Sequence, residues 1–266
     1  MGRKPPRLPR RAGPRCLSTV LHAIRPPEPG SSCPSLQAGV LGKGASLIQP
    51  LPAAIVFDFD LTLVDSTPAF VHCHAFASRQ SGLQPPPAEA VAPTIGTPLP
   101  EVFLRLHGRD HLDKLDDYLS AYQQHADEVM TGLTRIIDGV PETLRALRSS
   151  GLKLGIVSQK LRHRVEDVLR AEGLLSLFDA ILGGDDLPDF KPDPRGLLLA
   201  IERLNAKPNA TLYVGDTVID AETAHRAGVG FVAVLTGPTT ADEFAPFKPI
   251  ATLASAGQLP AFLNLA

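Results

Sequence analysis

Short apolar runs alternate with amphipathic segments along the chain from residue 51 onward. Five runs with few polar residues cover residues 53–57, 153–157, 178–182, 211–214 and 231–235. Such runs are typical of strands buried on both faces of a sheet. Three amphipathic segments between them predict helices, at 141–150, 161–172 and 194–205. The alternation of strand and helix predicts an α/β fold in which helices flank an open parallel sheet.

About eighty residues between the first strand and Asp138 interrupt this alternation. They contain no strand-like run, and helical patterns cover residues 67–80, 98–106 and 112–130. We therefore predict a Rossmann-like sheet with a small α-helical cap domain inserted after the first strand. The cap would span residues 67–137, and the core would comprise residues 51–66 and 138–266. Ligands bind at the carboxyl edge of open α/β sheets, so the cap is placed to cover the site.

Residues 1–50 have a different composition from the rest of the chain. They carry eight Lys or Arg residues and one acid, a charge of +7, whereas the remainder carries −9. Nine of the 26 prolines lie here, and no hydrophobic period is visible. We interpret this segment as a disordered, basic, Pro-rich extension. It could be an organelle transit peptide, a stretch upstream of the true start, or a basic arm that contacts an anionic surface.

Composition excludes several classes of protein. The hydrophobic fraction of 44% argues against global disorder, and 5% aromatic residues without Trp disfavour base stacking on nucleic acid. Eighteen consecutive apolar residues occur nowhere, so no transmembrane helix is expected. Three cysteines without metal-ligand spacing suggest a reducing compartment. A cytoplasmic location is expected, or an organelle if the extension is a transit peptide.

Polar side chains follow the predicted strands near the point where each strand ends. The candidates are four carboxylates, one hydroxyl and one ammonium group: Asp58, Asp60, Asp216, Asp220, Ser158 and Lys191. Clustered carboxylates repel one another unless some are protonated or a cation lies among them. Oxygen ligands of this kind suit Mg²⁺, and a lysine and a serine suit phosphate. One aspartate can act as a nucleophile and a second as general acid and base.

These residues resemble the four motifs of haloacid dehalogenase-like (HAD) phosphatases. The run 58–66 (DFDLTLVDS) resembles the first motif, and Ser158-Gln159-Lys160 resembles the second, with Gln159 in place of the usual Asn. Lys191 matches the third motif, and the G-D-x-x-x-D spacing from Gly215 to Asp220 matches the fourth. The resemblance covers residues 53 to about 237.

The resemblance implies a role for each candidate residue. Asp58 would attack phosphorus and form an aspartyl-phosphate, and Asp60 would act as general acid and base. Ser158 and Lys191 would hold the phosphoryl oxygens. Mg²⁺ would be held by the Asp58 carboxylate, the Asp60 backbone carbonyl and the Asp216 carboxylate, while Asp220 orients the metal shell. An aspartate at position 60 favours phosphate transfer over dehalogenation, because a dehalogenase has no alcohol to protonate.

The helical insertion resembles the cap of the subclass that contains phosphoglycolate phosphatases, pyrophosphatases and β-phosphoglucomutases. The run 94–99 (TIGTPL) resembles the cap loop that faces the substrate in that group. We therefore expect a Mg²⁺-dependent phosphatase acting on a small phosphorylated metabolite, with 2-phosphoglycolate as the best guess. A pyrophosphatase and a phosphomutase remain alternatives, as does an inactive binding module. Neither nucleic acid nor membrane is an expected partner, and the oligomeric state stays open.

Several other polar residues have a structural interpretation beside a functional one. Asp185 and Asp186 would cap a turn or orient Lys191, and Asp220 alone would complement a helix dipole. The remaining candidates are expected to be solvated: His72, His74, Arg79, Arg105 and Arg109. As alternatives, either histidine could face the substrate, and an arginine among them could anchor a substrate carboxylate.

Overall fold

The core of the protein is a parallel six-stranded sheet in the order β5-β4-β1-β6-β7-β8. The computed structural model describes residues 50–265, so the predicted N-terminal extension, apart from Pro50, lies outside the described residues. The strands of the sheet are β1 (Ala54–Phe57), β4 (Lys153–Val157), β5 (Ala180–Leu182), β6 (Thr211–Gly215), β7 (Gly230–Val234) and β8 (Ala251–Leu253). The five predicted strands are confirmed, and β8 was missed because it is a half-exposed edge strand of three residues.

Strand β1 lies at the centre of the sheet, and every residue in it is buried. Its side chains alternate between two hydrophobic clusters, with Ile55 and Phe57 on one face and Ala54 and Val56 on the other. This alternation is the period of a strand, and it explains why the run is apolar throughout. The unbroken apolar run at 54–57 is therefore explained by burial of β1 between two layers of helices.

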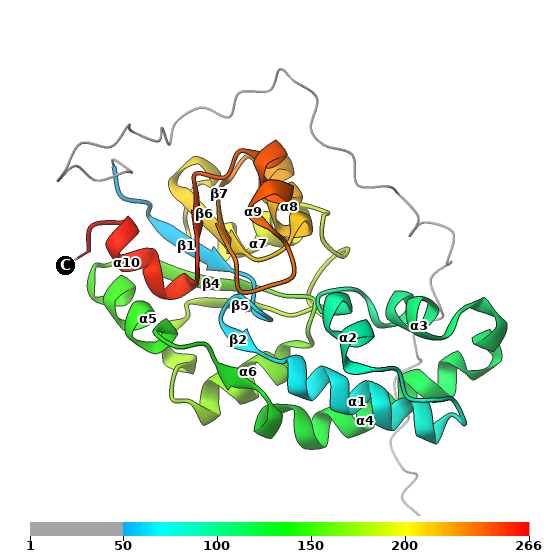
Figure 1. Ribbon diagram of the computed structural model, residues 1–266. Helices are drawn as coiled ribbons and strands as arrows, with labels where there is room; N and C mark the ends of the chain where they lie inside the picture. The colour runs from blue at the N-terminus through cyan, green and yellow to red at the C-terminus, as the bar shows by residue number, and fades with distance from the viewer. Residues whose placement is uncertain (1–49, 266) are drawn as a thin grey trace, which may run out of the picture.

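Helices cover both faces of the sheet, which confirms the predicted α/β fold (Figure 1). Buried residues of α5, α6 and α10 share a cluster with one face, and those of α7 and α8 share a cluster with the other. The core helices are α5 (Val140–Ser149), α6 (Arg162–Ala171), α7 (Arg195–Arg203), α8 (Val218–Ala227), α9 (Ala241–Phe244) and α10 (Leu259–Phe262). The three helices predicted for the core correspond to α5, α6 and α7.

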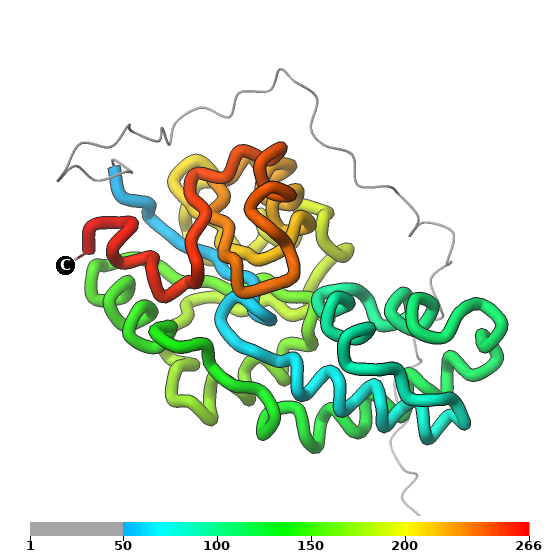
Figure 2. Tube along the Cα trace, in the orientation of Figure 1, coloured from blue at the N-terminus to red at the C-terminus, as the bar shows by residue number. Residues whose placement is uncertain are grey.

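The insertion after β1 forms a helical lobe with a hydrophobic cluster of its own. Its helices are α1 (Thr67–Gln80), α2 (Ala88–Val91), α3 (Leu99–His107) and α4 (Leu115–Leu133). The prediction for α1 is confirmed, whereas residues 109–114 form a 3₁₀ helix with a kink at His111, so α4 begins later than expected. Figure 2 follows the chain from β1 into this lobe and back to the sheet through α5.

The expectation that the insertion lacks strands is wrong in one detail. Strand β2 (Val64–Asp65) pairs antiparallel with β3 (Arg135–Ile136), so the two connections between core and cap lie side by side. Two residues are too few to show a hydrophobic pattern, so this ribbon could not be predicted from the sequence. The ribbon ties the outgoing and returning chain together at the boundary of the cap.

The expectation of a solvated His74 is also wrong, although His72 is exposed. His74 is fully buried in the cap, and its Nδ1 lies 2.5 Å from the Tyr118 hydroxyl. Burial lowers the pKa of His74 to about 3, so the ring is neutral. Among residues 50–265, no helix has the length and apolar character needed to cross a membrane.

Leu144 and Leu198 offer a matched test of the predicted core packing. Leu144 on α5 is fully buried, whereas Leu198 on α7 is 38% exposed. Leu144→Ala should lower the free energy of unfolding by about 2–5 kcal/mol because it leaves a cavity. Leu198→Ala should cost less than about 1 kcal/mol. Urea denaturation measures both, and equal losses would contradict the assigned layers.

Candidate active site

The first acidic pair is held by a sharp turn at the end of β1. The amide of Asp58 donates to the Val214 carbonyl at 2.9 Å, which continues the pairing of β1 with β6. The chain then folds back, and the amide of Leu63 donates to the Phe59 carbonyl at 2.9 Å. Asp58 and Asp60 are both nearly buried. The turn therefore places two carboxylates at the carboxyl edge of the central strand.

Ser158 and Lys160 follow β4, the neighbour of β1 in the sheet. Ser158 is buried, and its hydroxyl accepts a hydrogen bond from the Lys160 amide at 3.2 Å. The Lys160 ammonium reaches both oxygens of Asp60, at 2.8 and 3.1 Å. Sequence reasoning did not select Lys160 as a site residue. Its position in the Ser-Gln-Lys motif was the signal that could have identified it.

Lys191 forms the charged centre of the site. Its ammonium lies 2.8 Å from Asp58 Oδ1 and 2.7 Å from Asp220 Oδ1, and it donates to the Tyr213 hydroxyl at 3.3 Å. Burial opposes the positive charge, but the attraction of Asp220 and Asp58 outweighs it and holds the pKa of Lys191 well above its ordinary value. Lys191 therefore stays protonated.

Asp220 combines a structural role with a role in the site. It forms a capping box with Thr217 at the start of α8, so it lies in the first turn, where an acid complements the helix dipole as expected. Its Oδ2 accepts from the Thr217 amide at 3.1 Å, and its Oδ1 accepts from Lys191 and from Tyr213 at 2.9 Å. Tyr213 was also missed by sequence reasoning, because it reads as one apolar position of β6. Both oxygens of Asp220 are thus engaged within the protein.

Asp216 lies against the backbone of the loop that follows β7. Its Oδ1 accepts a hydrogen bond from the Thr62 hydroxyl at 2.8 Å. A Cβ atom built on Gly237 would lie 1.9 Å from Asp216 Oδ2, so no larger residue fits at position 237 without moving the carboxylate. The close approach of this loop fixes Asp216 beside the first motif.

Three of these buried carboxylates form a group that could hold a cation. Asp58, Asp216 and Asp220 each offer an oxygen within 4.8 Å of the others. Burial raises the pKa of Asp58 to about 7, because its effect, together with repulsion by Asp220 and Asp60, outweighs the attraction of Lys191, which lowers the pKa. Burial and repulsion by Asp58 and Asp220 raise the pKa of Asp216 well above its ordinary value. One ammonium is too little charge for three carboxylates, so the site favours a proton or a further cation.

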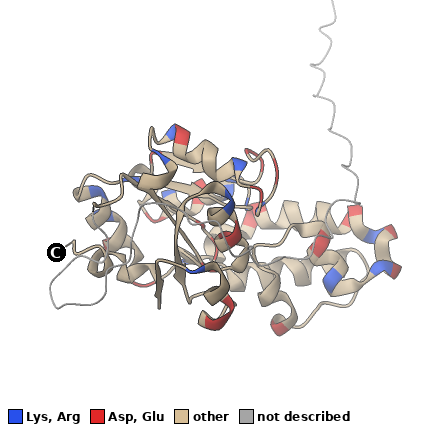
Figure 3. Cartoon of the chain, turned by 90° about the horizontal axis from the view of Figure 1, so that it is seen from above, with Lys and Arg blue, Asp and Glu red and all other residues tan. Residues whose placement is uncertain are grey.

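The donor set fits Mg²⁺. Among the described residues, Asp58 Oδ2 and Asp216 Oδ2 accept no hydrogen bond, whereas both oxygens of Asp220 are engaged. Hard carboxylate oxygens of this kind are the ligands that Mg²⁺ prefers. Seen from above, both acidic and basic positions occur in each lobe (Figure 3).

The remaining candidates lie outside this cluster. Asp186 accepts from the Gly183 amide at 3.0 Å, which confirms the turn-capping interpretation for that residue. Asp185 instead accepts from the amide of Arg162, the first residue of α6, at 2.8 Å. Arg79 and Arg109 are exposed, as expected. Arg105 is exposed as well and pairs with a neighbouring acid on its own helix.

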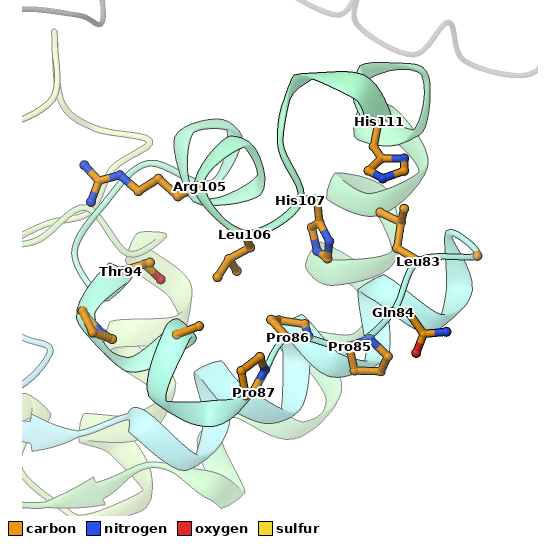
Figure 4. A pocket seen from close by; sticks show the side chains of 13 residues that line it. Leu83, Gln84, Pro85, Pro86, Pro87, Thr94, Arg105, Leu106, His107 and His111 are labelled. Atoms are coloured by element: carbon orange, nitrogen blue, oxygen red, sulfur yellow. The ribbon is translucent and has the colours of Figure 1, made fainter.

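Arg105 lines a cavity of about 690 Å³ in the cap (Figure 4). Prolines 85–87, His107 and His111 also line it, and Thr94 joins it from the cap loop. Its lining contains no residue of the carboxylate cluster. The cavity and the cluster are therefore separate features of the described chain.

Comparison with known proteins agrees with this geometry. The family model of haloacid dehalogenase-like hydrolases matches residues 55–234. The chain is 35% identical to the phosphoglycolate phosphatase of Nitrosospira multiformis, over 67% of this chain and 82% of that protein. It is 32% identical to pyrophosphatase PpaX of Bacillus velezensis, over 73% of this chain and 89% of that protein.

A solved structure supports the same assignment. A candidate haloacid dehalogenase-like hydrolase from Bacteroides fragilis is 38% identical to this chain, with a TM-score of 0.74. The match covers 78% of this chain and 99% of that one. The similarity therefore includes the cap as well as the sheet.

The raised pKa of Asp58 has a consequence for stability in the absence of a divalent cation. The folded state retains a proton on Asp58 between about pH 4 and pH 7, where the unfolded chain has released it. Asp58 therefore stabilises the fold below pH 4, and that contribution is lost as the pH rises through about 7. The contribution of His74 to stability changes with pH in the opposite direction, because its pKa is lowered. The contribution of Asp58 is therefore measured as the difference between wild type and a variant at position 58.

We expect wild type to lose more stability than Asp58→Asn between pH 5 and pH 8. Urea denaturation in the presence of a chelator, at both pH values, measures the difference. Parallel losses in the two proteins would contradict the pKa assigned to Asp58.

Proposed function

This chain belongs to the haloacid dehalogenase-like hydrolases and is a phosphatase, and from that premise we propose that it hydrolyses 2-phosphoglycolate or a similar small phosphomonoester through an aspartyl-phosphate on Asp58. The observation that carries the proposal is the position of the Lys191 ammonium, 2.8 Å from the carboxylate that would be the nucleophile. An ammonium so placed can hold a phosphoryl oxygen beside the attacking atom. Positioning and positive charge are what a loose phosphoryl-transfer transition state requires.

The reaction divides into two steps. Asp58 attacks phosphorus in line, the ester P–O bond breaks, and the leaving alkoxide takes a proton from Asp60. Water then attacks the aspartyl-phosphate, Asp60 takes a proton from that water, and free phosphate and the Asp58 carboxylate are restored. Lys191 and Ser158 hold the phosphoryl oxygens in both steps. Lys160, which contacts both oxygens of Asp60, fixes the orientation of that carboxyl group.

We propose that the carboxylates of Asp58 and Asp216 and the backbone carbonyl of Asp60 would hold Mg²⁺. When bound, the ion would neutralise the carboxylates and the negative charge of the phosphoryl group. Asp220 would belong to the surroundings of the metal, since its oxygens hold Lys191, Tyr213 and Thr217. The body of the chain carries −9, so this local positive charge lets an anionic ester approach.

The cap would cover this site and supply substrate specificity. We propose the domain division stated above, with residues 67–137 as the cap, because the β2–β3 ribbon lies at both of its boundaries. A relative of 35% identity named phosphoglycolate phosphatase supports 2-phosphoglycolate as the substrate. A relative of 32% identity named pyrophosphatase keeps inorganic pyrophosphate as the second candidate.

Asp58→Asn should abolish hydrolysis, because the side-chain amide is a poor nucleophile and cannot form the acyl phosphate. We expect a loss of more than about 1,000-fold in kcat with p-nitrophenyl phosphate and Mg²⁺. Asp185→Asn is the matched control, since this acid lies outside the carboxylate cluster and accepts from the first amide of α6, so the variant should retain most of the activity. Retained hydrolysis by Asp58→Asn would refute the proposed nucleophile.

The substrate and the metal can be tested together. We expect phosphate release from 2-phosphoglycolate to exceed that from pyrophosphate in kcat/KM, and both to vanish when a chelator removes Mg²⁺. A higher kcat/KM for pyrophosphate would select the second candidate. Full activity in the chelator would exclude the metal from the reaction.

A further inference from the structure

One hydrogen bond joins the phosphate side of the site to the cap loop. Gln159 follows Ser158 in the turn after β4, and its side-chain amide Nε2 donates to the Gly96 carbonyl at 2.7 Å. Gly96 lies in the run 94–97 between α2 and α3. The contact therefore connects two loops that are 63 positions apart in sequence and belong to different lobes.

Each partner of this bond is held in place by its own lobe. On the core side, the Gly184 amide donates to the Lys160 carbonyl at 2.8 Å, and a Cβ atom on Gly184 would lie 2.4 Å from the Gln159 carbonyl oxygen. On the cap side, the Thr94 hydroxyl donates to the Val91 carbonyl at 2.7 Å, and the Thr97 amide donates to the Thr94 carbonyl at 3.0 Å. The bond thus ties two ordered turns together.

The neighbours of Gln159 also face the cap. The Lys160 ammonium lies 4.8 Å from the centre of the Phe70 ring on α1. The Arg164 guanidinium is buried and donates to Asp127 at 2.7 Å and to the Gln123 carbonyl at 2.9 Å, both on α4. These contacts fix the helices of the cap, whereas Gln159 alone among the three reaches the loop between α2 and α3.

The length of the side chain matters for this contact. The resembled motif usually has Asn at this position, and Asn is shorter by one methylene group. The hydrogen bond from Gln159 to the Gly96 carbonyl is 2.7 Å long, and a side chain shorter by one methylene group would not reach that carbonyl from the same backbone position. The Gln159 Oε1 atom is buried without a partner among the described residues, so the amide is oriented by the single bond from Nε2.

We propose that Gln159 is a positioning residue for substrate specificity: it fastens the cap loop at 94–97 over the phosphate-binding turn, so that the loop meets the organic part of the ester. This inference rests on the proposed function, because it assumes that the ester binds between Ser158 and the cap. The loop is then part of the binding site for an ester, and it is not part of the site for orthophosphate alone.

Two variants test separately the length of the Gln159 side chain and its hydrogen-bond donor. Gln159→Asn keeps the amide and shortens it, and Gln159→Met keeps the length and removes the donor. Each should raise KM for 2-phosphoglycolate by about 3- to 10-fold, the effect of one lost hydrogen bond. Each should leave the inhibition constant of orthophosphate within about 2-fold, because phosphate contacts the core. Gln124→Asn is the matched control, since this exposed glutamine on α4 donates to Ser120 on the same helix at 3.3 Å.

Hydrogen exchange of peptides that contain residues 94–97 supplies a readout that needs no activity. Faster exchange there in both variants, with no change in α4, is the expected result. An unchanged KM, a parallel rise of the orthophosphate constant or unchanged exchange would each overturn the proposal. If wild type releases no phosphate from any ester, the proposed function fails, while the exchange measurement still tests the contact.

Discussion

The position of Lys191 between two buried carboxylates is the interaction on which the whole site depends. Burial of Asp58, Asp216 and Asp220 without compensation would cost far more free energy than a domain of this size can spare. Lys191 offsets part of that cost, and Asp220 and Tyr213 hold the ammonium in place. The remaining imbalance is what makes the site receptive to a cation and to an anionic ester.

The sheet determines where these charges can meet. Asp58, Ser158 and Asp216 follow β1, β4 and β6, which are adjacent in the sheet although they are far apart in sequence. The parallel arrangement directs all three strand ends toward one edge, and the cap leaves from the same edge. The catalytic candidates are therefore a consequence of strand order, and each strand contributes one or two polar residues at its end.

Much of this could be predicted from the sequence, because burial on both faces leaves an unbroken apolar run. The five buried strands were identified in that way, and the six candidate site residues were selected from their positions after these strands and from the motifs they resemble. Strands β2, β3 and β8 could not be found, since two or three half-exposed residues carry no period. Side chains whose role depends on a distant partner were also hidden. His74 was expected to be solvated because its partner Tyr118 is 44 positions away in sequence. Tyr213 fits the pattern of any core residue of a strand, and its bond to Asp220 is visible only in the structure.

The central position of β1 has a consequence for folding during protein synthesis. Asp58 and Asp60 are synthesised early, whereas Lys191 and Asp216 follow more than 130 residues later. A nascent chain that ends before β6 contains Asp58 and Asp60 but lacks Asp216 and the neighbour on one side of β1. The carboxylate cluster therefore cannot be complete before β6 and the start of α8 have been synthesised, although its first member belongs to the first strand of the sheet.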